Sequence, residues 1–136
     1  MKERYLYRAK RIDNGEWVEG NRIDDGVTGK VFIHAVGNSV NESDKVGEEG
    51  CLRFVAFEVD PSTICQCTRL RDKNGKLIFE NDIVRCGRNF TVTWCGRFAG
   101  WSLETTGLAY SNFFGEAYDP EDVEIIGNIF DNPDVI

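Results

Sequence analysis

Short apolar runs, interrupted every few residues by Gly, Asn or Asp, constrain the fold of this chain more than any other feature. No segment keeps the 3.6-residue repeat of an amphipathic helix over the length that a helix needs. The runs are rich in aromatic and β-branched residues, which favour strands. We therefore expect a mainly β protein, a small barrel or sandwich of short antiparallel strands.

Turn-forming residues divide this pattern into hairpins. The clearest turn is Asp72-Lys73-Asn74-Gly75, between strands expected over residues 64–70 and 77–79. The Asp72 side chain can accept a hydrogen bond from the backbone two residues on, and Asn74 and Gly75 tolerate the left-handed conformations of a tight reversal. One short helical turn is predicted near the C-terminus, where Asp119 can cap and Pro120 suits the first position.

The chain is expected to contain two β subdomains, residues 1–60 and 61–136, with a single domain as the alternative. Residues 37–50 are almost entirely polar and predict a surface loop, which is also a candidate contact site.

Residues 59–84 resemble the signature of the YopX-like family of phage and prophage proteins. That signature has a Gln-Tyr-Thr-Gly-Leu run, an Asp-Lys-Asn-Gly turn and an Ile-Tyr-Glu-Gly-Asp-Ile-Val run, and a Gly-Asn-Ile followed by Asn-Pro comes later. Here the corresponding runs are 66–70, 72–75, 78–84 and 127–133. The resemblance implies a mainly β protein of phage origin, and it brings no activity, cofactor or catalytic residue with it.

Two positions depart from the family pattern, because Arg69 and Asn81 stand where it has glycine. Asn tolerates a positive φ better than other non-glycine residues, so Asn81 fits a left-handed turn. For Arg69 two alternatives remain open: a side chain that points outward, or a local rearrangement of the backbone.

Asp72, Glu80 and Asp82 are the best carboxylate group for catalysis or a divalent ion, and Glu80 and Asp82 would share a side if the segment were extended. The alternative, which we favour, is that Asp72 and Asp82 hold turns. We also favour a structural role for His34 and for the cysteines. The number of cysteines is odd, so they cannot all be paired in disulfides. A zinc site would need Cys65, Cys67, Cys86 and Cys95 together, but their spacing is unlike that of zinc knuckles. We expect no cofactor and no metal.

Charge is distributed unevenly along the chain. The net charge is −7, which excludes a globally basic nucleic-acid binder, yet residues 69–97 carry +4 and residues 98–136 carry −8. Basic and aromatic side chains in the first of these segments could follow a single nucleic-acid strand, and the candidates are Arg85, Arg88, Arg97 and Trp94. Alternatively, the acidic segment lies against the basic strands.

These observations favour a phage- or prophage-derived accessory protein that binds another macromolecule, a host or phage protein, without catalysis of its own. Nucleic-acid binding is the alternative, and a small metal-dependent enzyme using Asp72, Glu80 and Asp82 is the third. The contact sites we expect are the 37–50 loop, the Asp72–Gly75 turn and the acidic end.

No apolar run is long enough for a membrane span, so we expect a protein of the bacterial cytoplasm without a membrane partner. Self-association is left open.

Overall fold

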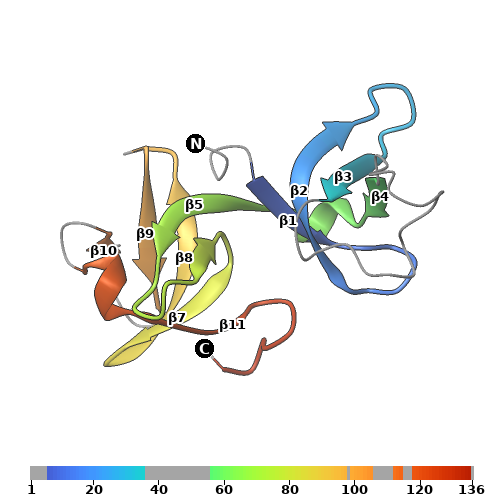
Figure 1. Ribbon diagram of the computed structural model, residues 1–136. Coiled ribbons are helices and arrows are strands. Elements are labelled where there is room, and N and C mark those ends of the chain that lie inside the picture. The colour runs from blue at the N-terminus through green and yellow to red at the C-terminus, as the bar shows by residue number, and fades with distance from the viewer. Residues whose placement is uncertain (1–5, 36–55, 98, 106–111, 115–117, 136) are drawn as a thin grey trace, which may run out of the picture. The chain divides into compact units, whose positions relative to one another are not determined.

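The computed structural model describes residues 6–35, 56–97, 99–105, 112–114 and 118–135, and these are mainly β (Figure 1). Antiparallel pairing joins all the named strands, which confirms the predicted fold class. The 37–50 loop, one of the expected contact sites, lies outside the described residues.

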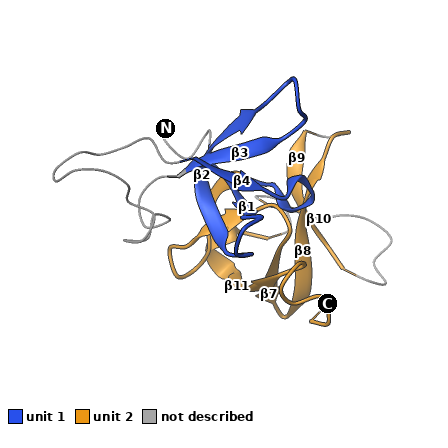
Figure 2. Cartoon of the chain, turned by 90° about the vertical axis from the view of Figure 1, so that its right-hand side faces the viewer, with its two compact units in different colours: residues 1–66 blue, residues 67–136 orange. Residues whose placement is uncertain are grey.

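The chain forms two compact units, residues 1–66 and 67–136 (Figure 2). The division falls inside strand β5 (Cys65–Arg71), a few residues after the boundary that the sequence suggested. It falls there because Cys65 and Gln66 pair with strand β1 of unit 1, whereas Cys67 and Arg71 pair with strand β6 of unit 2.

Unit 1 is a meander of antiparallel strands in the order β4-β3-β2-β1, with the first residues of β5 added beside β1. Its elements are β1 (Leu6–Lys10), β2 (Trp17–Asp24), β3 (Val31–Ala35), β4 (Ala56–Val59) and the 3-10 turn η4 (Pro61–Thr63). Alternate residues of these strands meet on one face to form its core, namely Ala9, Val18, Val31, Ile33 and Val59.

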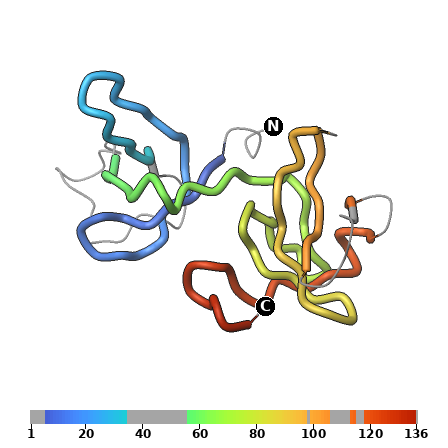
Figure 3. The backbone as a smooth tube through the Cα atoms, turned by 180° about the vertical axis from the view of Figure 1, so that it is seen from behind, coloured from blue at the N-terminus to red at the C-terminus, as the bar shows by residue number. Residues whose placement is uncertain are grey.

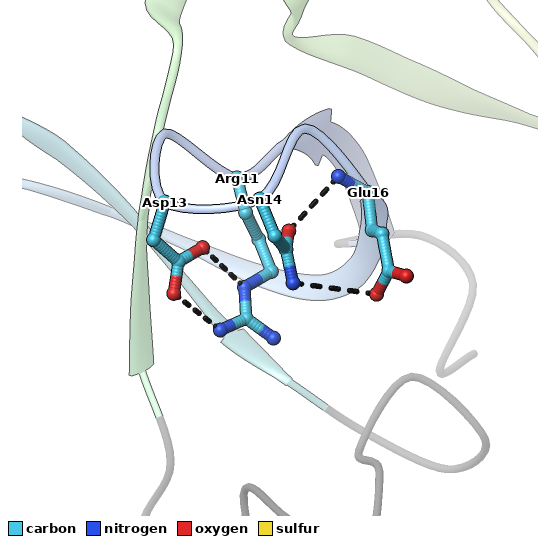
Figure 4. A network of polar contacts seen from close by, with 4 residues as sticks. All are labelled: Arg11, Asp13, Asn14 and Glu16. Atoms are coloured by element: carbon cyan, nitrogen blue, oxygen red, sulfur yellow. Dashed lines mark hydrogen bonds and ion pairs between the residues drawn. The ribbon is translucent and has the colours of Figure 1, made fainter.

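The β1–β2 connection is held by its own polar side chains (Figure 4). Arg11 donates through Nε to Asp13 at 2.8 Å, and Asn14 accepts from the backbone N–H of Glu16 at 2.9 Å. Gly15 takes a φ of 73°, a conformation that glycine adopts at little steric cost. The guanidinium carbon of Arg11 also lies 3.9 Å from the centre of the Phe57 ring, so this arginine joins the turn to β4.

Unit 2 is built around a second antiparallel sheet, in the order β10-β9-β8-β7-β11. Its elements are β6 (Leu77–Phe79), β7 (Asp82–Cys86), β8 (Arg88–Cys95), β9 (Gly100–Glu104), β10 (Asn112–Phe113), the 3-10 turn η5 (Pro120–Asp122) and β11 (Glu124–Asn128). The core of the unit consists of Ile78, Val84, Phe90, Val92, Leu103 and Val123. The predicted C-terminal helical turn is confirmed as η5, where Asp119 accepts from the N–H of Glu121 at 3.1 Å.

The β5–β6 hairpin contains a bulge. Cys67 pairs with Phe79 and Arg71 with Leu77, so β5 has extra residues between the two pairs. Arg69 lies in the bulge with a φ of 68°, a left-handed conformation. Its side chain is exposed, and Thr68 supports the bulge by donating to the carbonyl of Ile78 at 2.7 Å.

After β11 the chain turns back on itself, as the red end of the tube in Figure 3 shows. The buried Asn128 holds this turn, because its Oδ1 accepts from the N–H groups of Phe130 and Asp131, both at 3.0 Å. Its carbonyl accepts from the N–H of Asn132 at 2.8 Å. The closing segment is therefore an ordered part of unit 2 rather than a loose tail.

Candidate functional site

Asp72 is a structural carboxylate at the start of the predicted turn. It is only 3% exposed. Its Oδ1 accepts from the N–H groups of Asn74 and Lys76, both at 2.9 Å, and its Oδ2 accepts from the N–H of Ile125 on β11 at 3.0 Å. Burial by itself raises the pKa of Asp72, but the hydrogen bonds from Ile125, Lys76 and Asn74 outweigh it, so the pKa lies below its ordinary value.

Asp82 and Glu80 lie on the two sides of a tight turn between β6 and β7. Asn81 between them has a φ of 71°, so the segment is not extended, and the left-handed turn expected there is present. Asp82 is 1% exposed and accepts from the N–H of Phe79 at 2.8 Å. Asp82 and Asp72 therefore both bind backbone N–H groups in this structure.

Across the part of the chain that the structure describes, no three His, Cys, Asp or Glu side chains lie together in a way that could hold a metal ion. Cys65 and Cys67 are buried, and Cys86 and Cys95 are partly exposed. Within the same residues, no helix is both long enough and apolar enough to span a membrane.

An open groove of about 670 Å³ lies between the bulged hairpin and η5 in unit 2. The hairpin contributes Arg69, Arg71 and Lys73 to the lining, and the segment at η5 contributes Asp119 and Glu121. The two sides of the groove thus carry opposite charge. The Asp72–Gly75 turn that we singled out from the sequence forms part of this lining, through Asp72 and Gly75.

Two basic residues of unit 2, Lys73 and Arg85, lie opposite Glu124 of the acidic C-terminal segment. Glu124 stands opposite Arg85 in the β7–β11 register, and the Nζ of Lys73 lies 3.9 Å from a carboxylate oxygen of Glu124. Both members of the Lys73–Glu124 pair are about half exposed, so the pair contributes little to stability. The carboxylate of Glu124 nevertheless offsets the positive charge of Lys73, and a nucleic acid would require that charge for contacts with its phosphates.

A pair of tryptophans occupies the far end of β8 and the start of β9. Trp94 and Trp101 are cross-strand partners, and their ring centres are 5.2 Å apart at an angle of 69°, an edge-to-face contact. Trp94 shares its face of β8 with the core residues Phe90 and Val92, yet it is 50% exposed. Arg97, in the turn that follows, is exposed as well.

The basic and aromatic candidates from the sequence therefore fall into two groups. Arg85 and Arg88 flank the β7–β8 turn at Gly87, whereas Trp94 and Arg97 are at the opposite end of β8. Arg88 and Trp94 are six residues apart on one strand, which at about 3.3 Å per residue separates their backbones by roughly 20 Å. The structure does not bring these four residues together into one patch.

A family model described as YopX protein matches residues 6–136 of the chain. The chain belongs to the YopX family. A search of curated proteins finds no match. The described structure now accounts for the positions at which this member departs from the YopX signature noted above.

Both departures are at left-handed backbone positions, where the glycine of the YopX signature avoids strain. Asn81 has a φ of 71° and Arg69 a φ of 68°. Features of both alternatives for Arg69 are present, since its side chain is exposed and its backbone lies in a bulge of β5. The Gly-Asn-Ile motif has a different reason: a Cβ on Gly127 would lie 2.7 Å from Cγ of Asn132.

Sequence reasoning missed two parts of the site. It did not single out Arg69, Arg71 and Lys73 as a group that faces Asp119 and Glu121 across a groove. It also did not recognise the contact between Trp94 and Trp101. Two signals in the sequence pointed toward the groove: the charge difference between the two segments, and the Asp72–Gly75 turn as an expected contact site.

Proposed function

We propose that this chain is a phage- or prophage-derived binding module of the bacterial cytoplasm that recognises another protein without catalysing a reaction. The observation that carries the proposal is the half-exposed Trp94, held edge-on against Trp101. We call Trp94, Trp101 and Arg97 the tryptophan surface.

The chemistry of this surface suits a protein partner. Tryptophan and arginine are enriched among the residues that dominate protein–protein affinity. The contact with Trp101 restricts the rotation of the Trp94 ring, so binding costs less side-chain entropy than it would for a freely rotating ring.

Two further observations support protein binding over the alternatives. Asp72 and Asp82, two of the three carboxylates considered for catalysis, are buried and hydrogen-bonded to backbone N–H groups. The arginines considered for nucleic acid lie at both ends of β8, and Arg85 faces Glu124.

Affinity capture from a bacterial lysate with two matched variants tests the proposal. Trp94→Ala removes the exposed ring, and Val27→Ala removes an exposed apolar side chain of unit 1 that is 94% accessible. We expect the wild type and Val27→Ala to retain a specific protein. We expect Trp94→Ala to bind that protein about 30-fold more weakly, which corresponds to a contribution of about 2 kcal/mol from the tryptophan.

Nuclease treatment of the lysate separates protein from nucleic-acid partners. If retention disappears after nuclease digestion, or if Trp94→Ala retains the same proteins as Val27→Ala, the proposal is wrong. Circular dichroism of each variant shows whether its fold is intact.

A further inference from the structure

The groove of unit 2 shares no lining residue with the tryptophan surface. Two segments line it, residues 69–75 of the bulged hairpin and residues 119–121 at η5. The first contributes the positive charges of Arg69, Arg71 and Lys73, and the second contributes the negative charges of Asp119 and Glu121.

Hydrogen bonds fix the two sides of this groove relative to each other. The N–H of Lys73 donates to the carbonyl of Val123 at 2.9 Å, and Asp72 accepts from the N–H of Ile125 at 3.0 Å. Asp119 caps η5 and thereby orders the acidic side. The charged side chains are therefore presented from a preorganised backbone, which lowers the cost of binding.

Arg69 gives an independent sign that the groove has a role. A non-glycine residue at a φ of 68° is strained, and glycine would relieve the strain at this position. The Arg69 side chain is exposed, so burial does not offset the cost. Strained backbone positions are concentrated at ligand-binding and active sites, and the Arg69 side chain lines the groove.

We propose that the groove binds an extended segment of a partner protein in which acidic and basic residues alternate. Successive side chains of an extended chain point to opposite sides. Such a segment would direct its carboxylates to Arg69 and Arg71, which pair with carboxylates through two parallel hydrogen bonds, and its basic residues to Asp119 and Glu121.

The charge on the η5 side argues against a nucleic acid in the same groove. Every phosphate of a nucleic-acid strand is negative, so a strand that contacts Arg69 and Arg71 would also lie close to Asp119 and Glu121. Like charges at short range cost binding energy. A chain of alternating charge satisfies both sides at once.

Two labelled hexapeptides of identical composition test the proposal by fluorescence anisotropy at low ionic strength. One alternates Glu and Lys, and the other has three Glu followed by three Lys. We expect the alternating peptide to bind the wild type at least about fivefold more tightly, because only its charges match both sides of the groove. Added salt is expected to weaken this binding.

Variants locate the binding. Arg69→Gly removes the guanidinium and suits the left-handed backbone, so its fold is preserved. We expect Arg69→Gly and Glu121→Gln each to weaken binding of the alternating peptide about fivefold, which corresponds to about 1 kcal/mol for an exposed ion pair. Arg88→Ala, outside the groove lining, is the control and is expected to leave the affinity unchanged.

Several results would overturn the proposal. These are equal affinity for the two peptides, no binding of either peptide, or an Arg69→Gly variant that binds as the wild type does. A short single-stranded oligonucleotide that binds in an Arg69-dependent manner, and displaces the peptide, would assign the groove to nucleic acid instead. Trp94→Ala is expected to leave peptide binding intact, which separates this proposal from the tryptophan surface.

Discussion

Asp72→Asn should destabilise unit 2 strongly although it changes one oxygen to nitrogen. Asparagine keeps Oδ1 for the N–H groups of Asn74 and Lys76, but it places a second donor where Oδ2 accepts from Ile125. Hydrogen bonds to ionised groups contribute about 1.5–3 kcal/mol each, and a buried N–H without an acceptor costs about 1–3 kcal/mol. We expect a loss of about 3 kcal/mol.

A loss of that size is readily measured. A domain of 60–100 residues loses about 4–8 °C in Tm per kcal/mol, so the midpoint of unit 2 should fall by at least about 10 °C. Thermal and urea denaturation followed by circular dichroism would give the shift. Asp134→Asn makes the same chemical change at an exposed position and should stay within about 0.5 kcal/mol of the wild type.

The reasoning fails if Asp72→Asn unfolds at the same urea concentration as Asp134→Asn. That result would mean that the carboxylate of Asp72 does not stabilise the junction between the hairpin and β11. A smaller loss than expected, with an unchanged urea dependence, would place the main contribution in the two turn bonds that asparagine retains.

Three further predictions concern the same unit. Folding lowers the pKa of Asp72 from its ordinary value of 3.8, so the carboxylate stabilises unit 2 fully above that pH, and this effect is lost as the pH falls through the lower, folded-state pKa. Denaturation at decreasing pH should therefore show a smaller difference in the free energy of unfolding between the wild type and Asp72→Asn. Gly127→Ala should cost about 1–3 kcal/mol in urea denaturation, because its Cβ meets Asn132, whereas Gly26→Ala, with nothing within 4 Å, should be close to neutral. Arg69→Gly should raise the free energy of unfolding by up to about 1 kcal/mol, and a lower stability would show that the left-handed arginine is not strained.

Local sequence predicted the turns well, because the atoms involved are close along the chain. Asp72 accepts from the N–H two residues on, as its position in Asp-Lys-Asn-Gly indicates. Its bond to Ile125 could not be predicted, since that residue is 53 positions away and no local pattern records the pairing of β11. The sequence therefore indicated a turn-forming carboxylate but not its second role in joining two elements.

The alternation of residues along β8 predicted the core face but not its limit. Phe90 and Val92 are fully buried, and Trp94 continues the same face, so alternation alone would place Trp94 in the core as well. Its half exposure depends on where the covering elements end, which is a property of the tertiary structure. The groove is similar: each segment shows its charge in the sequence, whereas their apposition depends on the path of the chain.

The strand that completes the second sheet, β11, comes last in chain order among the described strands of that sheet. β11 pairs with β7, and its Ile125 N–H donates to Asp72. A nascent chain that ends before Glu124 therefore lacks one hydrogen-bond donor to the Asp72 carboxylate and lacks the edge strand beside β7. Long-range closure of this kind is slow compared with hairpin formation. We therefore expect unit 2 to reach its native state only after the ribosome has released β11, and until then its hairpins are exposed to chaperones and proteases.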